Sequence, residues 1–210
     1  MIRPGQLNLM SAGHGIAHAE LSTPSGVTGV QLWVAQPEGT RHGEPGFEHH
    51  AELPRVELPG GEAGVLMGTF AGATSPARAD TPLVGVDLRL RRRTVTEIPA
   101  DETFEYCVAP VDNPVKLGDD IVEAGWLGIV PSGRRSLLIE TGDADAHVML
   151  LGGEPLGEPI QMWWNFVART KDELGRAWED WRDGNDDRFG PVPSSLDRID
   201  APIPPWVPAG

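Results

Sequence analysis

Short stretches of alternating apolar and polar residues dominate this chain, and residues that favour turns separate them. Alternation over four to eight residues is typical of β-strands with one buried face. We expect strands in these ranges: 29–34, 64–71, 83–91, 103–109, 120–123, 126–130, 135–140 and 146–151. Gly-Asp-Asp, Pro-Ser-Gly and Thr-Gly-Asp steps between them predict tight turns. This regular spacing predicts an all-β fold of antiparallel strands in a sandwich or barrel.

One helix interrupts this pattern near the C-terminus. Thr170 followed three residues later by Glu173 matches a capping box, in which each side chain binds the other residue's backbone amide. Gly184 stands where a helix commonly ends on a glycine. The apolar residues between them recur at helical spacing and give the helix one apolar face: Leu174, Ala177, Trp178 and Trp181. We expect the tryptophans to anchor a core rather than to stack on a ligand.

The remaining segments show no clear period. Residues 40–62 are expected to form a loop, and residues 72–82 a linker. The last segment, 190–210, contains six prolines and is predicted to be either an extended strap or a disordered end.

Composition restricts the class of protein further. Of 210 residues, 40% are apolar and 23% are charged, which is typical of a globular domain with a core. The single cysteine, Cys107, excludes an intrachain disulfide and is expected to be a buried thiol. No apolar run is long enough to span a bilayer, and the first residues do not resemble a signal peptide, so we expect a cytoplasmic protein.

The charge is negative and unevenly distributed. The net charge is −14, of which residues 1–100 carry −2 and residues 101–210 carry −12. An acidic second half argues against direct binding to a nucleic-acid backbone. The one basic cluster, Arg89 with Arg91–Arg93, is expected to be the solvated face of a strand and its turn, with contact to an anionic partner as the alternative.

The candidate chemistry lies in the octapeptide Gly13–Glu20. If this segment is a strand, His18 and Glu20 point to the same side and lie roughly 6.5 Å apart along the backbone. A neutral imidazole and a carboxylate are part of the ligand set that non-haem Fe(II) favours. The alternative is a histidine–carboxylate pair without a metal.

Other histidines fit a metal site less well. On the same strand His14 would share a face with His18, so a ligand role stays open for it. His49 and His50 are adjacent and would point to opposite faces of a strand. His42 and His147 have no partner signature and are expected to be surface or hydrogen-bonded residues.

With these residues in view, the chain resembles the pirin family of the cupin superfamily. Three stretches carry the likeness: 3–20, which ends in His-x-Glu, 29–34, and 157–167 with the helix that follows it. The resemblance implies tandem cupin jelly-roll β-barrels, the first incomplete, and one C-terminal α-helix. The implied domains are a remnant of the first cupin (1–78), a second cupin with its closing helix (79–189) and the proline-rich tail (190–210).

The resemblance also implies a metal and an activity. His18 and Glu20 match the third and fourth metal ligands of the family, and the metal is usually iron. The first two ligands belong to a His-x-His motif upstream of the Pro4-Gly5 turn, where this sequence has no such motif. Pirins with an intact site are associated with quercetin 2,3-dioxygenase activity, so the implied substrate is a flavonol-like small molecule and Glu20 has a second implied role as catalytic base.

Two further functions remain open, and the sequence leaves undecided whether the chain is an enzyme. It could be a non-enzymatic regulatory module whose acidic half meets a basic protein partner, or an inactive truncated pirin. Met1 is expected to be internal to a longer reading frame, and the alternative is a true truncation that pairs with another copy as a homodimer.

Overall fold

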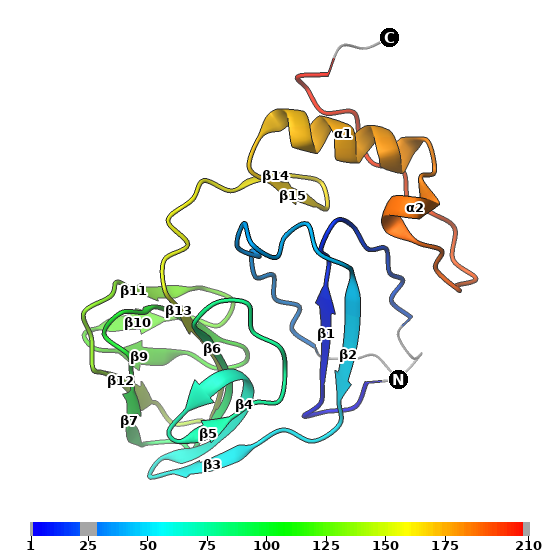
Figure 1. Ribbon diagram of the computed structural model, residues 1–210. Helices are drawn as coiled ribbons and strands as arrows, with labels where there is room; N and C mark the ends of the chain where they lie inside the picture. Colours follow the sequence, from blue (N-terminus) through cyan, green and yellow to red (C-terminus); the bar gives the residue numbers. More distant parts are fainter. Residues whose placement is uncertain (1, 22–28, 208–210) are drawn as a thin grey trace. The chain divides into compact units, whose positions relative to one another are not determined.

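A computed structural model describes residues 2–21 and 29–207 (Figure 1). The described chain is mostly β, with fifteen strands and two helices. It separates into two compact units. Unit 1 comprises Met1–Leu9 and Phe47–Pro155, and unit 2 comprises Met10–Gly46 and Leu156–Gly210. These units are discontinuous in sequence, and the division at residues 78 and 189 stays a prediction.

Unit 1 contains two antiparallel sheets. The larger one has the strand order β11-β8-β13-β6-β4-β3, with β5 paired to β4, and the smaller one has the order β10-β9-β12-β7. The strands of the larger sheet are β3 (Arg55–Leu58), β4 (Gly61–Phe70), β5 (Ala73–Thr74), β6 (Leu83–Leu90), β8 (Glu105–Pro110), β11 (Gly128–Val130) and β13 (Ala146–Gly153). The smaller sheet consists of β7 (Val95–Pro99), β9 (Val115–Leu117), β10 (Asp120–Val122) and β12 (Ser136–Thr141).

Side-chain alternation explains why these strands form two facing sheets. On β6, Val86, Leu88 and Leu90 are buried, whereas Asp87 and Arg89 face outward. Buried residues of the smaller sheet, such as Ile98 and Ile139, belong to the same apolar cluster. Each fully buried side chain of this size contributes roughly 1.5–3 kcal/mol. The predicted outward face of Arg89 is thus confirmed, and all six predicted strands between residues 83 and 151 are present.

The second unit is built around tryptophans. It contains β14 (Gln161–Trp163), β15 (Phe166–Ala168), α1 (Lys171–Arg182) and the short α2 (Asp186–Phe189). Leu174, Ala177 and Trp178 of α1 are buried with Phe166, and Trp181 packs against them. The tryptophans therefore form a core, as predicted.

The ends of α1 follow the predicted signals. The Thr170 hydroxyl accepts from the Glu173 amide at 3.2 Å, and the Glu173 carboxylate accepts from the Thr170 amide at 3.3 Å. Asp183 is the C-cap, and the following Gly184 has a φ of 71°, which glycine adopts without strain. The capping box is confirmed, whereas α2 was not predicted.

The proline-rich tail lies along α1 as a strap up to Val207. Three indole nitrogens donate to its carbonyl groups: Trp181 to Ile199 at 3.0 Å, Trp178 to Ala201 at 3.2 Å, and Trp163 to Pro202 at 2.9 Å. The Arg198 guanidinium also stacks over Trp181, with 4.2 Å between its carbon and the ring centroid. These contacts support the strap, the first of the two predicted alternatives.

Several predictions near the N-terminus are wrong. The structure assigns no strand to residues 12–21 or 29–36. The predicted loop 40–62 contains β2 (Gly46–His50), β3 and the start of β4, and β2 pairs with β1 (Leu7–Ser11). The alternation of apolar and polar residues is a poor guide here. It indicates that a segment can form a strand, but not that a neighbouring strand is available to pair with it.

Cys107 is only half-buried. It lies on β8, on the face opposite to buried Tyr106 and Val108. Partial burial raises the pKa of the Cys107 thiol, so the thiol stays protonated near neutral pH. The prediction of a buried thiol is thus met only in part, because Cys107 is half-buried.

Candidate metal centre

His18 and Glu20 lie in an irregular segment of unit 2. His18 Nδ1 and Glu20 Oε1 are 4.0 Å apart, and the side chains are 41% and 71% exposed. The predicted same-side placement therefore occurs without the predicted strand. Both side chains face solvent, so each can rotate without disturbing a core.

Glu20 has a further hydrogen-bond partner among the residues that the structure describes. The Gln31 side-chain nitrogen donates to Glu20 Oε1 at 3.2 Å. Gln31 belongs to the stretch 29–34, for which a strand was expected. Strand alternation gave no reason to associate Gln31 with Glu20, because the contact depends on how two irregular segments approach each other.

The chain just before His18 is held by a close backbone approach. Gly13 has a φ of 52°, and a Cβ atom at this position would lie 2.1 Å from the Gly43 carbonyl oxygen. The same oxygen accepts from the His14 amide at 2.9 Å and from His14 Nδ1 at 3.0 Å. Only glycine satisfies both the positive φ and the short distance, so Gly13 fixes the start of the candidate site.

The C-terminal part of unit 2 holds the same segment from the other side. The Ala17 amide donates to the Phe189 carbonyl at 3.0 Å, and Arg188 Nε donates to the His14 carbonyl at 3.1 Å. Arg188 is itself held by Asp180 of α1 at 2.7 Å. The position of His18 therefore depends on α2. The two segments are more than 170 residues apart in the sequence, so no local pattern reveals their contact.

A charged network links the 36–43 loop to α1. Arg41 forms an ion pair with Glu173 at 2.9 Å and another with Glu38. The Arg169 guanidinium donates to the Gln36 carbonyl at 2.8 Å. The Arg169 amide, the Arg41 guanidinium and the Thr170 amide lower the pKa of Glu173 to about 2, so this carboxylate is ionised at neutral pH.

The donors of this site fit iron in type but not in number. Two ligands in adjacent positions around one ion lie about 3 Å apart, since metal–ligand bonds are roughly 2.1 Å long. His18 and Glu20 would therefore have to approach each other by about 1 Å, which their exposure permits. Among residues 2–21 and 29–207, however, no three His, Cys, Asp or Glu residues gather where they could hold a metal ion. The described residues thus supply two candidate donors, which is fewer than a complete metal site needs.

The other histidines contact neighbours of their own. His49 Nδ1 donates to the Asn8 side chain at 2.8 Å, and His50 Nε2 donates to Glu48 at 2.9 Å. His49 and His50 are consecutive residues of β2, so their side chains point to opposite faces of the strand, as predicted. His147 Nε2 lies 2.9 Å from Asp87 Oδ1 in unit 1. His14 lies in a turn and not on a strand with His18, so the register that suggested a ligand role is absent.

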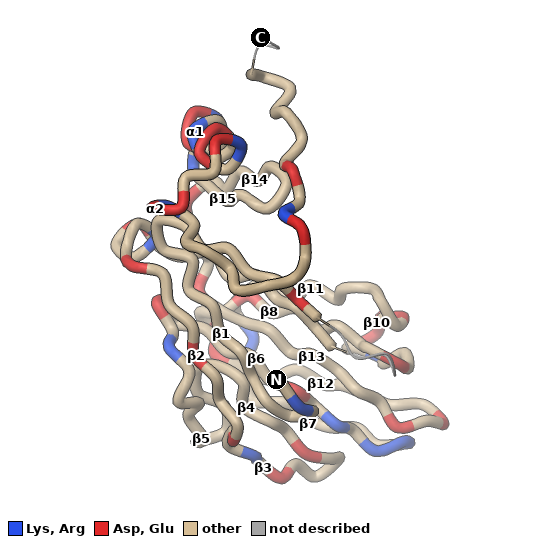
Figure 2. The backbone as a smooth tube through the Cα atoms, turned by 90° about the vertical axis from the view of Figure 1, so that its right-hand side faces the viewer, with Lys and Arg blue, Asp and Glu red and all other residues tan. Residues whose placement is uncertain are grey.

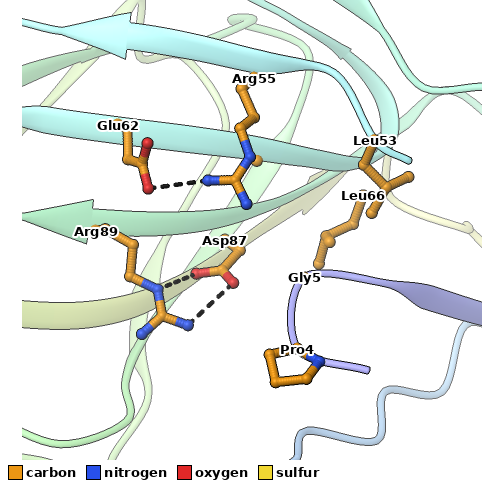
Figure 3. Close-up of a pocket in the computed structure, with 9 residues that line it drawn as sticks. Pro4, Gly5, Leu53, Arg55, Glu62, Leu66, Asp87 and Arg89 are labelled. Atoms are coloured by element: carbon orange, nitrogen blue, oxygen red, sulfur yellow. Dashed lines mark hydrogen bonds and ion pairs between the residues drawn. The ribbon is translucent and has the colours of Figure 1, made fainter. Parts of the chain in front are cut away.

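Unit 1 has a shallow pocket of its own, of about 280 Å³ (Figure 3). Its polar walls are two ion pairs, Arg55 with Glu62 at 3.0 Å and Arg89 with Asp87 at 3.1 Å. Leu53, Leu66 and the Pro4-Gly5 turn form the remaining wall (Figure 3). Its charges cancel in pairs, and none of its residues was predicted to bind a metal or a substrate.

Comparison with known proteins defines the class of the chain. Two facing antiparallel sheets around an apolar core are typical of a cupin, and residues 85–190 match the family model described as the pirin C-terminal cupin domain. Residues 1–34, which include His18 and Glu20, match the family model described as pirin. The chain belongs to the pirin family, as the resemblance implied.

Relatives and solved structures agree with this assignment. A Pseudomonas aeruginosa protein with the provisional name quercetin 2,3-dioxygenase is 40% identical over 98% of this chain and 66% of its own length. A pirin-like protein of Caulobacter vibrioides is 33% identical over 88% of this chain and 65% of its own length. The crystal structure of a quercetin 2,3-dioxygenase from Acinetobacter baumannii matches 99% of this chain and 70% of that chain, with a TM-score of 0.86 and 39% identity. The predicted all-β tandem cupin fold is thereby confirmed.

The chain spans about two thirds of the length of these curated relatives. In the part of the chain that the structure describes, no helix combines the length and apolar character needed to cross a membrane.

Proposed function

We propose that this chain contributes His18 and Glu20 to a quercetin 2,3-dioxygenase-type site, as two protein ligands of a mononuclear Fe(II). The observation that carries the proposal is the 4.0 Å separation of His18 Nδ1 and Glu20 Oε1 on two exposed side chains. This pair lies within the residues that match the pirin family model, and relatives over nearly the whole chain bear the name quercetin 2,3-dioxygenase.

The proposal requires more ligands than the described residues provide. Two donors seldom hold iron, because a facial triad is the usual minimum. The missing donors would come from residues outside the described part or from a second copy of the chain in a homodimer. A flavonol-like small molecule is the proposed substrate.

Glu20 has a second proposed role as a base. Its carboxylate is 71% exposed, and among residues 2–21 and 29–207 Gln31 donates to Oε1, so the other oxygen can reach a substrate hydroxyl. A flavonol has an acidic enol hydroxyl of the kind that a carboxylate can deprotonate. Gln31 would orient Glu20 for this step by occupying Oε1.

Anaerobic reconstitution tests the metal proposal. The full chain and its His18→Ala variant are incubated with Fe(II), separated from free metal, and assayed for iron content and for quercetin-dependent oxygen uptake. We expect the chain to retain several times more iron than His18→Ala. His42→Ala is the matched control, because His42 is an exposed histidine outside the pair. Equal iron in all three proteins would contradict the ligand role of His18.

A second candidate function follows from the incomplete donor set. A chain with only two of the ligands would act as a non-enzymatic regulatory or protein-binding module. The reconstitution separates the two functions, since a chain that keeps iron but shows no oxygen uptake with quercetin fits the second. Oxygen uptake that His18→Ala abolishes fits the first.

A further inference from the structure

An exposed apolar patch lies at the edge of the larger sheet in unit 1. It consists of Trp126, Leu127 and Ile129, which are 71%, 63% and 66% exposed. We refer to these three residues as the β11 edge patch. A tryptophan alone can bury roughly 150–250 Å² in an interface. Three large apolar side chains within four residues are therefore a candidate interaction surface.

Backbone hydrogen bonds hold the turn that carries Trp126. The Trp126 amide donates to the Glu123 carbonyl at 3.0 Å, and Gly125 in the turn between them has a φ of 82°. The Gly125 amide also donates to the Pro110 carbonyl at 3.0 Å, which ties the turn to the end of β8. A tryptophan on a fixed turn loses little conformational entropy on binding, as is typical of interface hot spots.

The backbone beside the patch is a sheet edge. β11 pairs with β8, with Ile129 opposite Cys107, and in the described chain no strand pairs with its other side. A Cβ atom at Gly128 would lie 2.8 Å from the Val122 side chain, so glycine allows β11 to pack closely on the strand before it. An edge of this kind can accept a further strand from another polypeptide.

The charge around the patch determines which polypeptide fits. From Asp101 to Val130 the chain carries seven Asp or Glu residues and one lysine. Lys116 lies 3.9 Å from Glu140, and acidic residues flank β10 in Figure 2. Arg134 and Arg135 follow β11, and Arg135 is paired with Glu102 at 2.8 Å. The exposed acids closest in sequence to the patch are Asp119, Asp120 and Glu123.

We infer that the β11 edge patch binds an extended basic segment of another protein, in which apolar residues alternate with lysine or arginine. The segment adds a strand to β11, places its apolar residues on Trp126, Leu127 and Ile129, and directs its cations to the surrounding acids. A second copy of this chain fits poorly, because the net charge of −14 places like charges opposite each other. This surface gives the protein-binding function above a location, and the metal proposal is independent of it.

The test uses three labelled peptides of about twelve residues, a length that suits strand addition. In the first, lysine alternates with valine and leucine; in the second, glutamate replaces lysine; in the third, serine replaces the apolar residues. Binding to the full chain is measured by fluorescence anisotropy at low and at moderate salt. We expect the first peptide to bind and its affinity to fall with salt, and the other two to bind at least about tenfold more weakly.

Variants locate the binding surface. Trp126→Ser should weaken binding of the first peptide at least about tenfold. Trp33→Ser is the matched control, because Trp33 is also an exposed tryptophan, and it should bind as the unaltered chain does. N-methylation of alternate residues of the first peptide should also weaken binding, since it removes the donors that pair with β11.

Four outcomes would overturn the inference. The first is equal binding of the first peptide to Trp126→Ser and to the unaltered chain, and the second is no binding of any peptide. The third is equal binding of the basic peptides with and without apolar residues. The fourth is self-association of the chain that Trp126→Ser abolishes. The last would identify a second copy as the occupant. Iron retention by Trp126→Ser should equal that of the unaltered chain, so failure here is distinguishable from failure of the metal proposal.

Discussion

The Arg41 guanidinium and the Glu173 carboxylate, 132 residues apart in the sequence, form an ion pair with a nitrogen-to-oxygen distance of 2.9 Å. Glu173 also closes the capping box of α1 and accepts from the Arg169 amide at 2.8 Å. One carboxylate therefore joins the helix start to the loop at residues 36–43. That loop in turn holds Gly13, because Gln36 accepts from its amide at 2.9 Å.

Replacing Glu173 with glutamine should destabilise the protein. Glutamine can still cap the helix, but it loses the charge that Arg41 and two backbone amides favour. We expect the free energy of unfolding to fall by about 1–3 kcal/mol, measured by urea denaturation. Glu179→Gln on the exposed side of α1 is the control and should change it by less than about 0.5 kcal/mol. Equal effects of the two changes would exclude a special role of Glu173.

The contribution of Glu173 should depend on pH in a defined window. Its pKa is about 2 in the folded protein, against 4.5 for the free side chain. Because the unfolded chain takes up the proton first, the stabilisation is complete above pH 4.5 and is lost as the pH falls toward 2. The difference in unfolding free energy between the unaltered chain and Glu173→Gln should therefore shrink over this range. A difference that stays constant, or grows, as the solution is acidified would be inconsistent with this pKa.

Gly13→Ala should disturb the candidate metal centre. Alanine at a φ of 52° is strained, and its Cβ atom would lie 2.1 Å from the Gly43 carbonyl oxygen. We expect a loss of about 2 kcal/mol or more in unfolding free energy and faster hydrogen exchange at the His14 amide, which donates to Gly43. Gly39→Ala is the control, since nothing lies within 4 Å of its Cβ position. If both variants behaved alike, Gly13 would not anchor the site.

Trp181→Phe should loosen the tail. Phenylalanine keeps an aromatic ring on the core but cannot donate to the Ile199 carbonyl. A cost of about 1 kcal/mol is expected, together with faster proteolysis within residues 190–207. Trp126→Phe is the control, because the Trp126 side chain is 71% exposed. Unchanged proteolysis in Trp181→Phe would mean that this hydrogen bond does not retain the strap.

Local sequence patterns predicted the second half of the fold well. The strands from β6 to β13 alternate cleanly because each has one face in a shared core, and Thr170, Glu173 and Gly184 mark the ends of α1 by their own backbone interactions. The short strands β7, β9, β14 and β15 were not predicted.

The first 60 residues were predicted poorly for a physical reason. Residues 29–34 have the composition of a strand, yet no strand of the described chain pairs with them, and β-structure requires a partner. Of the site, His18 and Glu20 could be named from the sequence. Gln31 and Arg188 could not, because their contacts with this segment depend on the tertiary arrangement of unit 2.

The most direct test of the metal proposal is to see which histidine a paramagnetic ion approaches first. Small amounts of Mn²⁺ are added to the ¹⁵N-labelled chain while the imidazole signals of its six histidines are followed by NMR. We expect the His18 signals to broaden first, and we expect Glu20→Gln to remove this preference. Broadening that begins at the His49 and His50 signals, or that affects all six histidines equally, would contradict a metal site at His18 and Glu20.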